Sequence, residues 1–431
     1  MKTARLVYAD ESGQLYDHPY LEMAGSSGGR WKEVEDDILI PLPPGSELFL
    51  LPDRMPVGYD RKKKRFIRLE EDPHNPQSKV QAVAAFMAPA HTQILTAAYH
   101  SEQNAPVLPL FSYTAVGWQE GQFVVAGVRV DPLVRQDIDQ FDLERLERKA
   151  RRALDLQRHN RLIQHLGTCA LTYGCPAARN YFLARWEAPL PTSPQCNSSC
   201  LGCISLQESD HICASQERIT FVPTPEEIAE IAVSHLQEAE DPLVSFGQGC
   251  EGEPLLQGKT LKEAIKLIRS QIKAGTINLN TNGSLPQTIA ELRDNGLDSI
   301  RVSLNSAREV YYQAYYRPRG YSYSDVTGAI RAMKSREGFV SINLLTLPGL
   351  TDEEGEVEAI IRLIDETGID LIQMRNLNID PEWYLRGIGD RSSGQSIGIL
   401  EMMKRIRTSH PQVNFGYFNP CLNPGKEKST A

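Results

Sequence analysis

Hydrophobic positions in the first third of the chain form short runs separated by turn residues. Residues 111–116 and 123–128 are apolar and flank Glu120-Gly121, a pair typical of a tight turn, so a hairpin is predicted there. Gly25 to Gly29 is predicted to be a flexible loop from its composition, and the basic run 61–65 to be a solvated loop between strands. Residues 1–135 are therefore expected to form a β-rich N-terminal domain, with substrate recognition or partner binding as its expected role.

The pattern changes to a helical period after residue 140. Leu143, Leu146, Ala150 and Leu154 follow at spacings of three and four on a basic background, which predicts one connecting helix from Phe141 to about Leu166. This helix leads into a short segment with two cysteines, Cys169 and Cys175. Residues 136–185 are expected to be a helical linker.

From residue 186 onward, apolar strand-like runs alternate with amphipathic helical segments. Thr224, Pro225 and Glu227 mark a helix start, because Thr caps the first N–H groups and Glu three residues later completes a capping box. Alternation of this kind predicts a parallel sheet with right-handed helical crossovers. Six such units fit in residues 186–410, with the strands at 186–190, 243–246, 276–280, 299–304, 340–345 and 370–375, and residues 411–431 are left as a C-terminal tail. The expected fold class is α/β.

Composition narrows the classes of function. The 431 residues carry a formal net charge of −9, which argues against a general nucleic-acid binder. We find no apolar run long enough to span a membrane and no secretory signal in the first residues, so no membrane association is expected. Eight cysteines, three of them clustered, indicate a reducing compartment and metal binding, and we expect a cytoplasmic protein.

Three of the cysteines lie within eight residues, Cys196, Cys200 and Cys203, in a C-x3-C-x2-C arrangement. A loop of small residues can fold three thiolates around one metal centre, and thiolates favour zinc or iron–sulfur clusters. A structural zinc site requires four ligands, and no second cysteine pair lies nearby. Three thiolates on a four-iron cluster leave one iron without a protein ligand and therefore open to chemistry.

This spacing resembles the signature of the radical S-adenosylmethionine (radical SAM) superfamily. The resemblance implies a partial (β/α)6 TIM-like barrel in which Cys196, Cys200 and Cys203 hold a [4Fe-4S] cluster. It also implies that the open iron binds S-adenosylmethionine and that reductive cleavage yields a 5′-deoxyadenosyl radical. The family usually has an aromatic residue before the third cysteine, whereas this chain has Gly202, so the adenine contact is expected from Ile204 or a later strand.

Further candidate residues follow the ends of the predicted strands, where the chemistry of such barrels is placed. The stretch Gly252-Glu253-Pro254 resembles the family's glycine-rich GGEP motif, which holds the amino group of S-adenosylmethionine, although Glu251 replaces the first glycine. Asn280, Ser303 and Asn305 are candidates for the ribose hydroxyls and the methionyl carboxylate, and Arg375 for a cofactor or substrate carboxylate. Turn chemistry alone is the alternative for the Asn residues.

A tyrosine-rich segment follows the fourth predicted strand, from Tyr311 to Tyr323, and contains Arg317. Its tyrosines are expected to line the mouth of the barrel, with Arg317 on the substrate side. An amphipathic helix whose tyrosines pack on neighbours is the alternative.

The remaining cysteines leave two interpretations open. Cys169, Cys175, Cys213 and Cys421 supply four thiols for an auxiliary [4Fe-4S] cluster, and Cys250 is the fifth thiol outside the triplet. The alternative is that all of them are buried reduced thiols that behave as small apolar groups.

The sequence therefore predicts a radical SAM enzyme that acts on an unidentified small molecule or peptide and takes its electron from a flavodoxin or ferredoxin. Alternatives are a radical SAM methyltransferase, a glycyl-radical activase, and a non-enzymatic iron–sulfur protein for electron transfer or sensing. The Gly252-Glu253-Pro254 stretch speaks against the last, because electron transfer needs no ammonium site.

Overall fold

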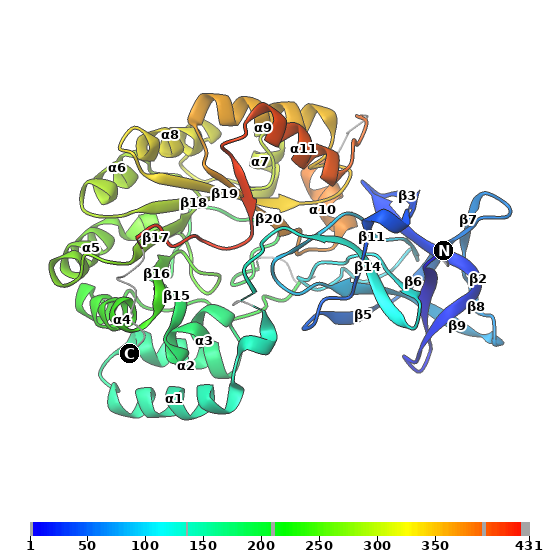
Figure 1. Cartoon of the computed structure of the whole chain (residues 1–431), viewed down its shortest axis with the longest axis horizontal. Coiled ribbons are helices and arrows are strands. Elements are labelled where there is room, and N and C mark those ends of the chain that lie inside the picture. The colour runs from blue at the N-terminus through cyan, green and yellow to red at the C-terminus, as the bar shows by residue number, and fades with distance from the viewer. Residues whose placement is uncertain (1–2, 135–136, 208–211, 390–393, 424–431) are drawn as a thin grey trace, which may run out of the picture.

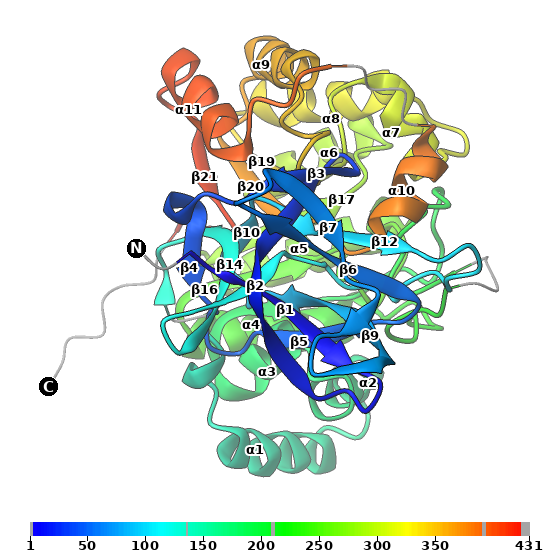
Figure 2. The same ribbon diagram turned by 90° about the vertical axis from the view of Figure 1, so that its right-hand side faces the viewer.

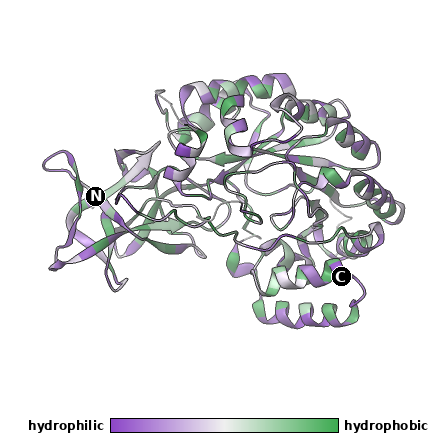
Figure 3. Ribbon diagram, turned by 180° about the vertical axis from the view of Figure 1, so that it is seen from behind, coloured by the Kyte–Doolittle hydropathy of each residue, from purple (hydrophilic) through white to green (hydrophobic). Residues whose placement is uncertain are grey.

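The computed structural model describes residues 3–134, 137–207, 212–389 and 394–423. A β-rich region and a larger α/β region lie side by side (Figure 1). No helix in these described ranges is long and apolar enough to cross a membrane. Hydrophilic and hydrophobic residues share the helices that surround the α/β sheet (Figure 3), as expected for helices with one buried face.

The β-rich region is one 14-stranded, antiparallel sheet whose central path runs β10-β14-β13-β1-β2-β6-β12. Its strands are β1 (Arg5–Asp10), β2 (Leu15–Ser27), β3 (Arg30–Glu33), β4 (Leu39–Pro41), β5 (Glu47–Leu51), β6 (Arg54–Asp60), β7 (Arg65–Arg68), β8 (Glu71–Asp72), β9 (Asn75–Phe86), β10 (His91–Gln93), β11 (Thr96–Ala97), β12 (Tyr99–Ser101), β13 (Val116–Gln119) and β14 (Gln122–Arg129).

Two of the predictions for this region are confirmed and one is wrong. Strands β13 and β14 form the predicted hairpin, with Glu120 and Gly121 both at positive φ, as a two-residue type I′ turn requires. The basic run is the turn between β6 and β7. The predicted loop at Gly25–Gly29 is instead mostly strand: Gly25 pairs with β3 and β11, and a Cβ there would lie 2.6 Å from Leu95. Close packing, and not flexibility, explains that glycine.

Three helices follow: α1 (Leu143–Leu156), α2 (Arg161–Leu171) and α3 (Pro176–Leu183). The prediction of one helix from Phe141 to Leu166 is wrong, because Asn160 interrupts it. The Asn160 side chain accepts from the N–H groups of Leu162 and Ile163 and so starts a new helix. Residues that favour caps also favour breaks, and helical periodicity alone does not reveal them.

The α/β region is built on seven parallel strands in sequential order, β15 to β21, which confirms the predicted α/β half barrel. Its elements are β15 (Arg185–Pro189), α4 (Pro225–Glu238), β16 (Glu240–Phe246), α5 (Gly258–Gln271), β17 (Thr276–Thr281), α6 (Pro286–Asp294), β18 (Ser299–Leu304), α7 (Glu309–Tyr316), α8 (Tyr323–Lys334), β19 (Phe339–Thr346), α9 (Glu354–Thr367), β20 (Leu371–Asn376), α10 (Pro381–Ile388), α11 (Ile399–Ser409) and β21 (Asn414–Gly416). The last strand lies in the segment that the sequence assigned to the tail.

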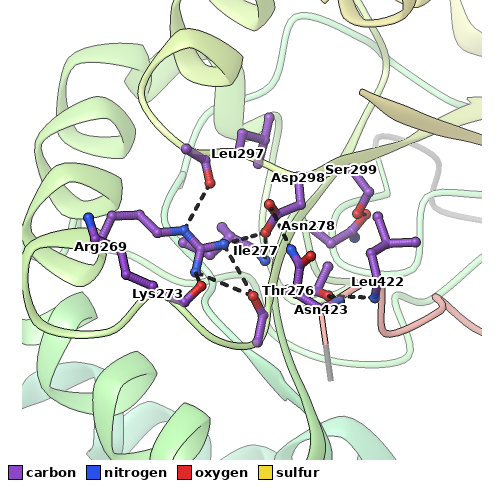
Figure 4. Close-up of polar contacts among 12 residues, drawn as sticks. Arg269, Lys273, Thr276, Ile277, Asn278, Leu297, Asp298, Ser299, Leu422 and Asn423 are labelled. Atoms are coloured by element: carbon purple, nitrogen blue, oxygen red, sulfur yellow. Dashed lines mark hydrogen bonds and ion pairs between the residues drawn. The ribbon is translucent and has the colours of Figure 1, made fainter. Parts of the chain in front are cut away.

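The tail returns beneath the barrel to the N-terminal ends of the strands (Figure 4). The Leu422 N–H donates to Thr276 Oγ1 (2.8 Å), and Asn423 Nδ2 donates to Asp298 Oδ1 (3.2 Å). Asp298 also pairs with Arg269. Residues 424–431 of the predicted tail lie outside the described residues.

The β-rich region lies in front of the α/β region in Figure 2. It contacts the C-terminal ends of β19 and β20, opposite the ends that the tail reaches. Gln93 donates through its N–H to Asn376 Oδ1 (2.8 Å) and through its side chain to the Thr346 carbonyl (3.0 Å). Arg54 and Asp380 form a buried ion pair at 2.8 Å. The region therefore stands beside the end of the barrel at which parallel strands present their functional residues.

Candidate active site

The three clustered cysteines lie on the loop that follows β15, and the end of α7 holds this loop. The N–H groups of Ser199 and Leu201 each donate to a carbonyl of α7, those of Tyr316 and Tyr315, at 3.0 Å. Arg319 donates to the Cys196 carbonyl (3.1 Å). The tyrosine-rich segment thus fixes the backbone of the cysteine loop, a role that its composition did not reveal.

The thiols of this loop are partly buried and stand apart from one another. Burial raises the pKa of both Cys196 and Cys200, and the nearby Arg218 opposes that effect. Arg218 also donates to Cys203 Sγ at 3.4 Å. The three sulfurs do not all lie within 4.8 Å of one another. That spacing suits a cluster whose thiolates bind different irons better than it suits a single ion.

A buried carboxylate, Glu251, joins the cysteine loop to the loop after β16. One of its oxygens accepts from the N–H groups of Thr192 and Ser193 (2.7 and 2.9 Å), and the other from those of Gly247 and Gln248 (2.8 and 2.7 Å). Burial raises the pKa of Glu251 to about 7, although the four N–H donors favour the charged form and so oppose this rise. The residue that replaces the first glycine of the motif therefore has a structural role of its own.

The glycine that follows allows two backbones to meet. The Gly252 N–H donates to the Ser193 carbonyl (2.7 Å), and a Cβ at this position would overlap the Gln195 carbonyl oxygen. Next to it, Glu253 accepts from the Thr281 hydroxyl (2.6 Å) and from the N–H groups of Leu255 (3.0 Å) and Asn282 (2.8 Å). Burial raises the pKa of Glu253 to about 7. Three donors occupy most of its lone pairs and fix its orientation.

A cavity of about 340 Å³ brings most of the predicted site residues together. From the predicted set it is lined by Cys196, Cys200, Cys203, Gly252, Glu253, Pro254, Asn280 and Ser303. Strand alternation places Ser303 and Arg301 on the same face of β18, and both line the cavity. Asn343 of β19 lines it as well. Within the described part of the chain, Arg301 Nε and Asn343 Oδ1 are buried without a hydrogen-bond partner, as expected of groups that face a ligand.

Three predicted residues do not line this cavity. Asn305 is buried and donates to the Tyr311 carbonyl and the Tyr384 hydroxyl, both at 3.1 Å. Arg375 stacks on Tyr417, with its guanidinium carbon 3.8 Å from the ring centre. Arg317 is exposed and lines a separate hollow of about 50 Å³ that also touches Cys200 and Cys203.

The four cysteines of the predicted auxiliary cluster are not brought together. Cys169 and Cys175 are neighbours, since the Cys175 N–H donates to the Cys169 carbonyl (2.9 Å). Cys213 is exposed, and Cys421 lies beside Thr276 and Pro242 at the N-terminal ends of β16 and β17. The thiol that approaches Cys169 is that of Cys250, which the sequence analysis left outside the set.

Sequence reasoning missed Arg218 and Arg301, whereas Tyr315 and Tyr316 line the cavity, as expected of the tyrosine-rich segment. The alternation Ile300-Arg301-Val302-Ser303 contained a signal for Arg301, because a charged residue on the inner face of a barrel strand needs a partner. Arg218 lies in a loop without periodicity, so no pattern marked it. A Cβ at Gly202 would lie 3.0 Å from the Tyr315 hydroxyl. Tyr315 of α7 therefore places an aromatic residue next to Gly202, the position at which the family usually has one in the loop.

The chain is similar to one known protein family. Residues 190–364 match the model of the Radical SAM superfamily. A search of curated proteins found no match.

Solved structures with a similar fold include anSMEcpe with bound AdoMet (18% identity, 45% of this chain and 52% of that chain covered, TM-score 0.35). They also include the methylornithine synthase PylB (17%, 56% and 68%, TM-score 0.38) and the coproporphyrinogen III oxidase HemN from Escherichia coli, a radical SAM enzyme (14%, 52% and 52%, TM-score 0.34). The chain spans about half the length of the first of these structures.

An α/β half barrel whose strand ends carry an open thiol triplet defines an iron–sulfur enzyme. The match to the family model makes the class specific: residues 190–364 form a radical SAM domain, with the reaction subclass left open. Such a domain implies a [4Fe-4S] cluster and S-adenosylmethionine. The residues present fit both, because three thiols, a buried carboxylate and unpaired polar atoms face one cavity.

Proposed function

We propose that this protein cleaves S-adenosylmethionine reductively and uses the product to abstract hydrogen from a small-molecule or peptide substrate. When bound, the cluster supplies the electron that breaks the sulfonium–C5′ bond to give methionine and a 5′-deoxyadenosyl radical. The observation that carries the proposal is the single cavity that the thiol triplet, the Gly252-Glu253-Pro254 loop and the ends of β17 and β18 line together.

The protein's own groups divide the binding between them. Cys196, Cys200 and Cys203 hold the cluster. Glu253 receives the ammonium of S-adenosylmethionine, because its carboxylate is buried, oriented by three donors and open to the cavity. Asn280 and Ser303 bind hydroxyl and carboxylate oxygens from the strand ends.

Arg301 is proposed to bind a carboxylate of the substrate or the cofactor. It lines the cavity, its Nε has no partner in the described ranges, and the charge of the neighbouring Arg375 adds to burial in lowering its pKa to about 9. An anion placed there would relieve both effects. A substrate with a carboxylate or a similar anionic group is therefore favoured.

The electron donor is proposed to dock at the hollow outside the cysteine loop. Cys200, Cys203 and Arg317 all line this hollow, so it would give a donor access to the two thiolates that would hold the cluster. Flavodoxin and ferredoxin are the proposed donors, and the exposed Arg317 suits an acidic partner. This position favours the donor side for Arg317 over the substrate side that the sequence suggested.

The test is product analysis after anaerobic reconstitution with iron and sulfide, with a strong reductant and S-adenosylmethionine but no added substrate. The proposal predicts 5′-deoxyadenosine from the wild type and from Cys213→Ser, a matched variant of an exposed thiol, and none from Cys200→Ala. S-adenosylhomocysteine in its place would indicate methyl transfer. An assembled cluster without either product would contradict the proposal and favour electron transfer or sensing.

A further inference from the structure

A second group of metal-ligand side chains lies outside the cavity, where α2 meets the loop after β16. His165 and Cys169 are one helical turn apart and therefore share a face of α2, with His165 Nε2 3.5 Å from Cys169 Sγ. Cys250 joins them from the other segment, and the three ligand atoms lie within 4.8 Å of one another. Cys169 and Cys250 are only 1% and 5% exposed.

The spacing of these atoms fits one ion and not a cluster. A tetrahedral zinc ion with Zn–S of ~2.3 Å and Zn–N of ~2.0 Å holds its ligand atoms roughly 3.5 to 3.8 Å apart. The observed imidazole–thiol distance falls in that range. Among the described residues, only this group of three or more ligands is so compact, and the Cys196–Cys203 triplet is not.

We propose that His165, Cys169 and Cys250 bind a single structural Zn²⁺ ion. Mixed imidazole and thiolate ligands suit zinc, and burial of both thiols suits a closed site without an exchangeable position.

We assign Cys175 as the fourth ligand; its sulfur lies outside the group of three that falls within 4.8 Å, so metal binding requires its side chain to turn toward them. A turn that passes through Gly174 (φ +67°) brings Cys175 back to the end of α2, where its N–H donates to the Cys169 carbonyl. Cys175 is also the N-cap of α3. Three thiolates and one imidazole would then complete the tetrahedron.

This ion would connect α2 to the loop after β16, which contains Gly252-Glu253-Pro254. Cys250 directly precedes Glu251 and Gly252, and its carbonyl accepts from the Ile219 N–H (2.8 Å). Gly249 and Glu251 line the cavity, whereas Cys250 does not, so its side chain leaves the loop on the other side. Zinc would therefore position the loop and take no part in the reaction. The site stands on geometry of its own and does not depend on the proposed function.

The test needs a background in which the triplet cannot capture metal. The full chain carrying Cys196→Ala, Cys200→Ala and Cys203→Ala is purified with zinc supplied and analysed for bound metal. About one zinc per chain is expected, with sulfur and nitrogen in its first coordination shell by X-ray absorption. Adding Cys169→Ala, Cys250→Ala or His165→Ala should remove it, whereas adding Cys213→Ser, an exposed control, should leave it.

Cobalt titration of the metal-stripped background chain keeps the proposal testable if a ligand variant does not fold. Thiolate-to-cobalt charge-transfer bands that saturate at one equivalent support the site. Failure of the background chain to retain zinc, zinc bound only through oxygen and nitrogen, or iron with inorganic sulfide in its place would overturn it. Zinc retained with unchanged affinity in Cys175→Ala would remove Cys175 as the fourth ligand.

Discussion

The two groups of thiols in this molecule flank one loop and differ in nearly every physical respect. Cys196, Cys200 and Cys203 come from one short loop, stand apart and line a cavity. Cys169 and Cys250 come from separate elements, meet a histidine at close range and are buried. We call Cys196, Cys200 and Cys203 the open group, because they line a cavity that has room for a ligand, and His165, Cys169 and Cys250 the closed group, because both of its thiols are buried. Our two proposals, a reactive centre and a structural one, therefore rest on how the thiols are spaced in the fold and not on their number.

The largest effect that separates the two groups is expected from Cys200→Ala. It should remove the iron–sulfur absorbance and lower 5′-deoxyadenosine formation by more than about a thousandfold, because two thiolates do not hold the cluster. Measurement of iron, zinc and product in the same preparation checks this. Zinc should be unchanged, and its loss together with iron would contradict the separation of the two groups.

Acid should weaken the packing of α4 against α3 and β15, because it protonates His235. His235 of α4 donates through Nε2–H to the Trp186 carbonyl (2.8 Å), and its ring contacts Tyr181 of α3. Burial lowers the pKa of His235 from 6.5 to about 4. The unfolded chain therefore binds a proton that the folded chain excludes, and stability present above pH 6.5 is lost as the pH falls to 4.

This loss should approach about 3 kcal/mol, since one pKa unit corresponds to about 1.4 kcal/mol. Denaturant unfolding at pH 7, 5.5 and 4 measures it. His235→Gln should flatten the dependence by that amount, and an unchanged slope would rule out His235 as its source.

Gly252→Ala tests the contact between the two loops. A methyl group there would overlap the Gln195 carbonyl, so the backbone must shift, which costs about 1–3 kcal/mol. Affinity for S-adenosylmethionine should fall at least about tenfold, measured by equilibrium binding to the reconstituted protein. Gly355→Ala is the matched control, because its nearest heavy atom would be 3.9 Å away and its affinity should equal that of the wild type. Equal affinity in both variants would contradict the assignment of this loop.

Arg218→Ala tests whether a nearby positive charge sets the reduction potential of a cluster bound by Cys196, Cys200 and Cys203. Loss of the guanidinium at Cys203 removes a positive charge that favours the reduced, more negative cluster. The reduction potential should fall by on the order of 60 mV, a tenfold change in the one-electron equilibrium. A spectroscopic redox titration measures it, with Arg218→Lys expected to recover part of the shift. An unchanged potential would show that the contact is structural only.

The smallest effect is expected from Arg317→Glu. Product formation driven by flavodoxin should slow about threefold at low salt, since a rim charge mainly affects association. Formation driven by dithionite should not change. Equal slowing with both reductants would place Arg317 in the reaction instead of the docking surface.

The sequence predicted a site well where all the residues of that site lie in one short segment. The cysteine triplet and Gly252-Glu253-Pro254 each lie within one short segment, so the spacing of their residues in the sequence predicts their chemistry. The alternation of strands and helices predicted the half barrel. The closed group could not be found in this way, because His165 and Cys250 meet only after α2 packs behind the barrel. Tyr315 and Tyr316 were visible as residues, but they act through their carbonyls, which every residue has.

The measurement that tests the account most directly is the count of iron, inorganic sulfide and zinc in one anaerobically reconstituted preparation of the full chain. The account predicts about four irons, about four sulfides and one zinc per chain. About eight irons with no zinc would contradict it, because both groups of thiols would then hold clusters.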